Sequence, residues 1–330
     1  MEFETYTGRW AEPAWRAEVL AWATERLAEH GLSLTGEPEQ PRMRPWSTMF
    51  VLPTDAGMYW LKANATAARY EAPLVDALAR WAPEHVLTPL AVDAERGFVL
   101  NPDGGTILRE ADPPAGAWES MVAQYAELQL AVAPHAGELV GLGVPDALPA
   151  HVPARVDELL DRLRATLAPD TSAALRAFVP RLAETCARLD QSPVPPSIDI
   201  DDLHDGNVFV RPGGRHVFFD WGDAAVSHPF VAFLVAMRSF AHRYELRAGA
   251  PELHRLRDAY LEPFTDVAPV AELRPLVEDA ARIATVTRAQ AWLRSYQDTP
   301  TDIAVEGVGA AAEWLGLMLD PELVPLGQSS

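Results

Sequence analysis

The stretch of sequence that decides the fold covers residues 197–223 and reads SIDIDDLHDGNVFVRPGGRHVFFDWGD. Two runs rich in β-branched and aromatic residues flank the sequence Pro-Gly-Gly at 212–214, which is typical of a tight turn. We therefore expect an antiparallel hairpin over 208–219, with Val208 opposite Phe219. Such a hairpin brings residues that are distant in sequence together at its open end.

Three oxygen-bearing side chains converge on that open end. Asn207 and Asp220 come directly before and after the two expected strands, and Asp202 lies in the loop that enters the hairpin. A carboxylate and an amide oxygen suit Mg²⁺, which takes a few protein oxygens and completes its shell with water and phosphate. Asn207 and Asp220 are therefore candidate metal ligands. Asp202 is left as a candidate base or orienting group for a hydroxyl nucleophile.

Two simpler interpretations of this segment stay open. Four aspartates fall within 199–205, so the loop could be only a solvated acidic surface. A calcium-binding loop fits less well, because the alternating Asp/Asn ligands, the Gly that follows them and the Glu at the twelfth position are absent. The combination of Asp-x₄-Asn, a hairpin and Phe-Asp-Trp is much more specific than Asp-x₄-Asn alone.

Lysine is used once in this chain. Of the 27 basic residues, Lys62 is the single lysine and the other 26 are arginines. A lone ammonium among so many guanidinium groups suggests a task for a compact point charge, such as binding phosphate oxygens. Lys62 follows an expected hairpin whose strands, 48–52 and 58–61, flank a turn at 53–57. An incidental surface lysine is the alternative.

Glu71 is the expected partner of this lysine. A helix is predicted over 66–82, and Glu71 falls on or beside its apolar stripe. A carboxylate that faces a core needs a counter-charge, which Lys62 at the end of the preceding strand can supply. The alternative is a Glu71 side chain that reaches solvent from the edge of the stripe.

Composition limits the classes of protein and partner. The chain has 330 residues, of which 48% are hydrophobic and 22% charged, as in one large or two ordinary globular domains. Its formal net charge of −20 argues against non-specific binding of nucleic acid. The single cysteine, Cys186, excludes an intrachain disulfide. Without a signal sequence or an apolar run of about 20 residues, we expect a cytoplasmic protein with no membrane partner, as a monomer or weak dimer.

A change in character near residues 101–105 divides the sequence into an expected N-terminal lobe, 1–103, and a C-terminal lobe, 104–330. The N-terminal lobe is mixed, with a helix expected at 12–30 and a connector at 34–46. The C-terminal lobe is mostly helical apart from the hairpin. The remaining expected elements are strands at 86–92 and 98–100 and helices at 117–132, 154–167, 171–190, 229–246, 251–263, 270–296 and 308–319.

The segment 199–229 resembles the aminoglycoside phosphotransferase and choline kinase family of small-molecule kinases. The usual family motif is His-Gly-Asp-Leu-His-x-Gly-Asn, then a hairpin, then Ile-Asp-Trp. This chain has Ile-Asp-Asp-Leu-His-Asp-Gly-Asn at 200–207 and Phe-Asp-Trp at 219–221. The resemblance extends over about 34–320 and implies an α+β, two-lobed protein-kinase-like fold, with a small β-rich N-lobe carrying one packed helix and a larger helical C-lobe. The chain departs from the motif at Ile200, where the family has a histidine that supports the catalytic loop.

The resemblance implies a role for each matching residue. Asp202 would be the catalytic aspartate, and Asn207 and Asp220 would bind Mg²⁺. Lys62 would bind the phosphates of ATP or, alternatively, GTP, and Glu71 would be the partner of Lys62 on the helix. The loop between the first two strands and the interlobe hinge would contact the nucleotide as well. The candidate nucleotide-binding residues in these two segments are Ser47, Thr48, Leu100, Asn101 and Asp103.

The acceptor is less constrained by the sequence. Acidic residues around the catalytic loop favour a cationic acceptor of the aminoglycoside, amino sugar or aminoalcohol class, and aromatic residues on the helix expected over 270–296 are candidates for lining its site. The candidate substrate residues are Asp199, Asp201, Asp205, Asp223, Trp292 and Tyr296. A solvated acidic face and aromatic residues in the core are the simpler interpretations.

The leading hypothesis is an ATP-dependent kinase that transfers the γ-phosphate to a hydroxyl of a small molecule. Resistance to an antibiotic, biosynthesis and salvage are roles that the sequence leaves open. The alternative is a pseudokinase-like protein that binds nucleotide or a small ligand without turnover, as the Ile200 departure suggests. A metal-dependent hydrolase would need more ligands than the acidic loop provides. Retention of Asp202 favours the kinase, because a binding protein needs no catalytic base.

Overall fold

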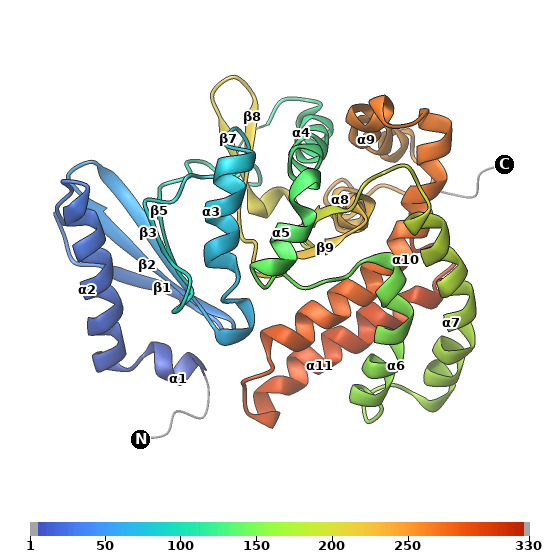
Figure 1. Cartoon of the computed structure of the whole chain (residues 1–330), viewed down its shortest axis with the longest axis horizontal. Helices are drawn as coiled ribbons and strands as arrows, with labels where there is room; N and C mark the ends of the chain where they lie inside the picture. The colour runs from blue at the N-terminus through green and yellow to red at the C-terminus, as the bar shows by residue number, and fades with distance from the viewer. Residues whose placement is uncertain (1–5, 112, 327–330) are drawn as a thin grey trace.

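The structure is a computed structural model that describes residues 6–111 and 113–326. It has two parts, which lie side by side in Figure 1: an antiparallel sheet with its flanking helices, and a mostly helical assembly. The predicted α+β class and the two-lobed arrangement are therefore confirmed. The boundary expected between residues 103 and 104 stays a prediction.

Five antiparallel strands form the N-terminal sheet in the order β1-β2-β3-β5-β4. Their bounds are β1 (Glu39–Met43), β2 (Ser47–Thr54), β3 (Gly57–Asn64), β4 (Ala91–Asp93) and β5 (Phe98–Pro102). Side chains alternate between the two faces of a sheet, so Phe50 and Leu61 are buried on one face while Lys62 points to the other. Strand β1 lies in the segment that was expected to be a connector. It was not predicted, because its mostly exposed side chains show no apolar alternation.

Helix α2 (Pro13–Glu29) covers the outer face of the sheet and follows the short helix α1 (Tyr6–Trp10) (Figure 1). It begins with a proline, which suits the first turn of a helix because the missing N–H has no helical partner there. Its apolar stripe is buried, and Trp22 packs edge-on against Phe98 with ring centroids 5.5 Å apart. The helix predicted over 12–30 is confirmed.

Helix α3 (Glu71–Trp81) lies between the sheet and the helical part (Figure 1). Its apolar face belongs to the core of the helical part, so α3 links the two parts of the molecule. The helix expected over 66–82 is divided, since Thr66–Ala68 form a separate 3₁₀ turn before α3 begins. Glu71 is consequently the first residue of a helix.

The predicted hairpin consists of β7 (Val208–Arg211) and β8 (Arg215–Phe218). Its register differs by one residue from the expectation, because Val208 pairs with Phe218 and not with Phe219. The two turn glycines adopt positive φ angles of 82° and 78°, which other residues rarely adopt, and they close the turn one residue earlier than expected.

The helical part contains eight helices among the described residues, and a small second sheet. The helices are α4 (Ala117–Val132), α5 (Ala136–Gly141), α6 (Val152–Arg162), α7 (Pro169–Asp190), α8 (Phe233–Arg243), α9 (Pro251–Leu261), α10 (Val270–Ser295) and α11 (Thr301–Gly316). Strands β6 (Ser197–Asp199) and β9 (Ala225–Ser227) pair with each other, and their short length left them unpredicted. The strand expected over 86–92 is reduced to β4, and α11 begins before residue 308. None of the helices described is long and apolar enough to span a lipid bilayer.

Candidate active site

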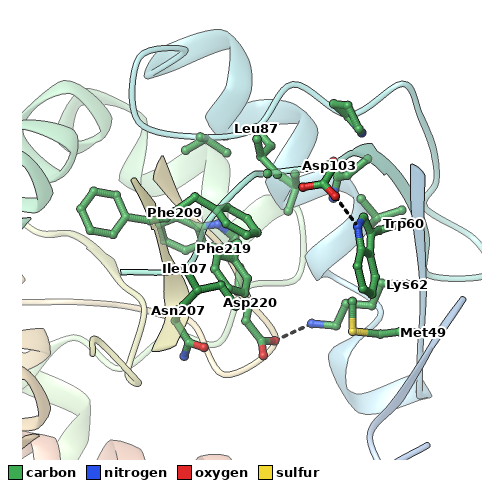
Figure 2. A pocket seen from close by; sticks show the side chains of 18 of the residues that line it. Met49, Trp60, Lys62, Leu87, Asp103, Ile107, Asn207, Phe209, Phe219 and Asp220 are labelled. Atoms are coloured by element: carbon green, nitrogen blue, oxygen red, sulfur yellow. Dashed lines mark hydrogen bonds and ion pairs between the residues drawn. The ribbon is translucent and has the colours of Figure 1, made fainter. Parts of the chain in front are cut away.

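A cavity of about 520 Å³ is lined by the N-terminal sheet and by the hairpin β7–β8. Lys62 reaches it from β3, Asn207 from the residue before β7, and Asp220 from the segment after β8. Figure 2 shows the Lys62 ammonium facing the Asp220 carboxylate, with Asn207 on the same wall. The Phe219 N–H donates to the Asn207 carbonyl (3.1 Å) and joins the two segments. The fold therefore brings these three candidate residues together.

Two carboxylates hold Lys62 at the cavity. Its Nζ lies 2.7 Å from Glu71 Oε2 and 2.5 Å from Asp220 Oδ1. The Lys62 side chain is 13% exposed and that of Glu71 is 3% exposed, so the charges compensate one another inside the protein. The Trp221 N–H donates to Glu71 Oε1 (3.0 Å) and ties α3 to the segment after β8.

The charge states of this cluster follow from its geometry. Burial alone would lower the pKa of Lys62, but the Asp220 and Glu71 carboxylates raise it above its ordinary value. Burial raises the pKa of Glu71, although Lys62 opposes this effect. Burial would also raise the pKa of Asp220, but the Lys62 ammonium holds it below its usual range. Lys62 and Asp220 are therefore charged at neutral pH.

Asp220 owes its direction to an uncommon backbone conformation. Its φ of 66° lies in the left-handed region, which aspartate tolerates better than most residues other than glycine and asparagine. Strand β8 ends at Phe218, and the chain then turns so that the Asp220 carboxylate faces Lys62 (Figure 2).

Asn207 and Asp202 form a second contact at the same end of the hairpin. The Asn207 Nδ2 donates to the Asp202 backbone carbonyl (3.0 Å) and approaches its Oδ2 (3.4 Å). Because the amide nitrogen is engaged in this way, the amide oxygen is available to a ligand. Figure 2 shows that oxygen on the side of Asp220. Asn207 and Asp220 could consequently offer one oxygen each to the same cation.

Asp202 is held as an ionised carboxylate. Its Oδ1 lies 3.3 Å from Arg288 Nη2, and its Oδ2 lies 3.4 Å from His204 Nε2. Burial alone would raise the pKa of Asp202, but the Arg288 guanidinium and His204 hold it well below its ordinary value. The side chain remains partly exposed, so a small molecule can reach an ionised carboxylate that can accept a hydrogen bond.

Arg288 on α10 is a residue of this region that the sequence did not reveal. Its side chain is only 7% exposed. It lies 3.2, 3.3 and 3.4 Å from three aspartates, namely Asp201, Asp202 and Asp223. Burial would lower the pKa of Arg288, but these three carboxylates raise it above its ordinary value. The one available signal is an arginine in a stretch of the expected helix whose neighbours are mostly apolar or small, and this signal does not identify the partners of Arg288.

The aspartates proposed for the acceptor occupy different environments. Asp199 is completely buried, and Asp201 lies almost as deep beside Arg288. Burial raises the pKa of Asp201 to about 6, although Arg288 opposes this effect. Asp205 is buried between two arginines at 2.9 Å each, Arg109 and Arg243. These three side chains are therefore buried within the protein.

Asp223 differs from those three aspartates, because its side chain is 32% exposed.

The two aromatic candidates on or after α10 pack against Trp46, which lies between β1 and β2. The Trp46 ring centroid is 6.4 Å from that of Trp292 and 5.5 Å from that of Tyr296. Tyr296 is buried in this contact, whereas Trp292 is partly exposed. The three rings join the end of α10 to the N-terminal sheet.

The expected nucleotide loop and hinge are only partly directed into the cavity. Ser47, Asn101 and Asp103 line it. Thr48 is buried, and its hydroxyl bonds elsewhere, to the Arg42 carbonyl and the Gln40 amide. The Leu100 side chain is buried in the core of the sheet because side chains alternate along β5.

Trp60 is a cavity residue that the sequence reasoning missed. It lies two positions before Lys62 on β3 and therefore on the same face of the sheet. Its Nε1 donates to Asp103 Oδ2 (3.4 Å), as Figure 2 shows. The stacked rings of Phe209 and Phe219, 4.1 Å apart, line the cavity from the hairpin. The period of two along β3 was the signal that could have identified Trp60.

Comparison with known proteins places this architecture among known folds. A crystal structure of a choline/ethanolamine kinase family protein from Mesorhizobium loti is 18% identical, with a TM-score of 0.60, and covers 93% of this chain and 97% of that chain. A macrolide 2'-phosphotransferase from Brachybacterium faecium is 17% identical, with a TM-score of 0.57 and coverage of 92% and 98%. An ethanolamine kinase from Plasmodium vivax is 12% identical, with a TM-score of 0.59 and coverage of 95% and 90%. These likenesses show a shared kinase-like fold.

At the level of sequence, comparison with curated proteins finds no match. The model of the family described as the phosphotransferase enzyme family, in contrast, matches residues 46–276. That range extends from the loop before β2 to the first turns of α10 and includes Lys62, Asp202 and Asp220. The match covers most of the sequence, and it shows that this chain belongs to the phosphotransferase enzyme family.

Proposed function

We propose that this phosphotransferase is a kinase that transfers the γ-phosphate of ATP to a hydroxyl group of a small molecule. The observation that carries the proposal is the convergence of Lys62, Asn207 and Asp220 on one cavity, with Asp202 bonded to Asn207 beside it. A cavity of about 520 Å³ is large enough for a ligand of nucleotide size.

The charged groups suit the phosphate end of a nucleotide. Lys62 would bind phosphate oxygens, since it lines the cavity and its ammonium is a compact point charge. Asn207 and Asp220 fit Mg²⁺, because each can offer an oxygen and the ion prefers a few protein ligands together with phosphate and water. When bound, Mg²⁺ would neutralise negative charge on the phosphates. Asp220 and Glu71 compensate the Lys62 charge within the protein.

The other end of the cavity suits a flat nucleobase. Trp60 and the stacked pair of Phe209 and Phe219 line it with aromatic surface. Aromatic side chains bind the faces of bases by stacking. Asn101 and Asp103 lie at the hinge end of the same cavity and provide polar groups for the edge of the base. We propose ATP as the donor, and GTP is the alternative to be compared in the same assay.

Asp202 would act on the acceptor. Its ionised carboxylate would orient the acceptor hydroxyl and receive the proton from it as the phosphoryl group is transferred. Positioning and charge neutralisation are the main contributions that a protein makes to this reaction. Arg288 and His204 lower the pKa of Asp202 against the opposing effect of burial, so the carboxylate stays ionised and can orient the hydroxyl by accepting a hydrogen bond from it.

The acceptor is proposed to be a hydroxylated molecule that carries an amino group. Asp223 supports this class, since its carboxylate is partly exposed and it shares Arg288 with Asp202. The partly exposed Trp292 lies one helical turn after Arg288 and would supply an apolar wall. Choline, ethanolamine and macrolides appear in the names of the structural neighbours, and such compounds belong in the first set of acceptors tested.

A coupled assay of nucleotide consumption tests the proposal. Aminoglycosides, amino sugars, hexoses, aminoalcohols and macrolides would each be supplied with ATP or GTP, with and without Mg²⁺. We expect consumption that depends on both the metal and one acceptor class, and loss of it in Asp202→Asn. If the protein binds nucleotide but consumes none in any arm, not even by slow hydrolysis, the result would support the pseudokinase alternative instead.

A further inference from the structure

The two residues before Asp202 depart from the family motif His-Gly-Asp. Ile200 is buried and offers no polar side chain to the catalytic loop. Asp201 occupies the position of the glycine, with a φ of 64° in the left-handed region that glycine adopts without strain. An aspartate that is held in this conformation points to a contact made by its side chain.

The Asp201 carboxylate joins the catalytic loop to α10. Its Oδ1 accepts a hydrogen bond from the Thr287 hydroxyl (2.8 Å), and its Oδ2 lies 3.2 Å from Arg288 Nη1. Both partners are consecutive residues of one helix. Because the Asp201 side chain is buried, these contacts serve the protein itself and leave no room for a substrate.

Arg288 contacts both Asp201 and Asp202, and so links the two residues. Its Nη1 contacts Asp201, while its Nη2 lies 3.3 Å from Asp202 Oδ1. A guanidinium is planar and its nitrogens have a fixed geometry, so a contact that fixes one nitrogen also fixes the other. The Trp314 ring lies against the group, 5.4 Å from its central carbon to the ring centroid. The guanidinium therefore has a defined place and plane.

We propose that Arg288 is a positioning residue, which holds the Asp202 carboxylate in the orientation needed to receive the proton of the acceptor hydroxyl, and that Asp201 anchors Arg288. The inference rests on the proposed function, because orientation of Asp202 matters to the rate only if the protein is a kinase. Arg288 on α10, anchored by Asp201 of the catalytic loop, supplies the polar support that Ile200 cannot give.

Three variants test this role. Arg288→Met removes the guanidinium, and Arg288→Met combined with Asp201→Gly also removes the most deeply buried of the three carboxylates that the first change deprives of their counter-charge. Arg282→Met is the matched control on the same helix. Its guanidinium donates to the carbonyls of Met318 (2.7 Å) and Asp320 (2.6 Å), away from the cavity lining. Turnover, binding of a non-hydrolysable ATP analogue and the unfolding temperature are measured for each variant.

We expect Arg288→Met to lower both the unfolding temperature and kcat, the latter by about 100-fold, while the affinity for the ATP analogue stays within about twofold. Adding Asp201→Gly should raise the unfolding temperature again, because an uncompensated buried carboxylate is removed and glycine suits the backbone there. It should not restore kcat, because Asp202 still lacks its partner. Arg288→Lys, which keeps the charge but not the fork, should have an intermediate kcat. The control should lose stability and keep kcat.

Recovery of kcat together with stability in the double variant would overturn the inference, since Arg288 would then act only on the fold. So would an Arg288→Met enzyme whose kcat equals that of the control. A wild-type protein that binds ATP but neither transfers nor hydrolyses its phosphate would overturn the proposed function, and this inference with it. The two failures are distinguishable because the second is visible in the wild type.

Discussion

The molecule contains two clusters of buried charged residues, and each is centred on a different type of cation. The Lys62 cluster joins one ammonium to two carboxylates, whereas the Arg288 cluster joins one guanidinium to three. Lys62 lines the cavity, and Arg288 does not. The single lysine therefore lies where its ammonium could bind a ligand in the cavity. The arginine lies where several carboxylates need a partner of fixed geometry.

The two clusters should also respond differently when they are broken. The Lys62 cluster would contact the nucleotide, so its loss should weaken both binding and turnover. The Arg288 cluster surrounds Asp202, so its loss should reduce turnover and leave the nucleotide bound. Four measurements test this contrast, beginning with the largest expected effect.

Asp202→Asn should lower kcat by about 1,000-fold, because the carboxylate that receives the proton becomes an amide. Nucleotide affinity should change little, since the Asn207 amide bonds mainly to the backbone carbonyl of residue 202, which the change retains. Steady-state kinetics and nucleotide titration measure the two quantities. Asp279→Asn is the control, because Asp279 lies on α10 and pairs with Arg188. Undiminished turnover in Asp202→Asn would remove Asp202 from the mechanism.

Lys62→Met should lower kcat/KM by about 100-fold through the loss of charge stabilisation on the phosphates. It should also destabilise the protein by about 3–5 kcal/mol, since Glu71 would be left as an unpaired buried carboxylate. Adding Glu71→Gln should restore much of the stability and none of the nucleotide affinity. Unchanged nucleotide affinity in Lys62→Met would contradict the assignment of this cluster to the nucleotide.

The difference between the clusters also explains which residues the sequence could predict. Glu71 lies nine positions after Lys62, and one hairpin joins Asn207 to Asp220. These relations are local, so strand and helix patterns sufficed to pair Lys62 with Glu71 and Asn207 with Asp220. Lys62 and Asp220 lie 158 positions apart, and the family resemblance was needed to place them at one site. Arg288 reaches its partners only through the packing of α10, and the single sequence contains no signal for that contact. Tertiary packing, not residue type, decides which of the many arginines lies beside Asp202.

The same limit applies to the fold. The main helices and the β2–β3 hairpin follow apolar patterns, and they could be predicted. Strand β1 has mostly exposed side chains, and β6 and β9 have three residues each, so none of these strands has a pattern long enough to recognise. The register of the β7–β8 hairpin depended on the conformation of two turn glycines, which composition alone does not fix.

Trp60→Ala sharpens the comparison, because it changes the cavity without altering any charge. We expect nucleotide affinity to fall by about tenfold through the loss of base stacking, while kcat at saturating nucleotide stays close to that of the wild type. Trp22→Ala is the control, since Trp22 packs on the outer face of the sheet against Phe98. Fluorescence or calorimetric titration provides the affinities. A kcat that falls while affinity is unchanged would show that Trp60 acts on the acceptor side instead.

The smallest expected effect concerns the pH dependence of stability. Burial raises the pKa of Asp201 to about 6 from its ordinary 3.8, against the opposing effect of Arg288. Between these two values the folded state binds more protons than the unfolded state, so this group makes the protein less stable as the pH rises. The low pKa values of Asp202 and Asp220 act in the opposite direction and mainly below pH 3.8.

Asp201→Asn isolates this contribution, because the variant retains Asp202 and Asp220. Between about pH 4 and pH 6, the unfolding temperature of the wild type should fall relative to that of the variant by about 2–4 °C. Thermal unfolding followed by circular dichroism at several pH values measures the difference. Parallel curves for the two proteins would mean that Asp201 keeps its ordinary pKa, and hence that Arg288 fully offsets the effect of burial on this carboxylate.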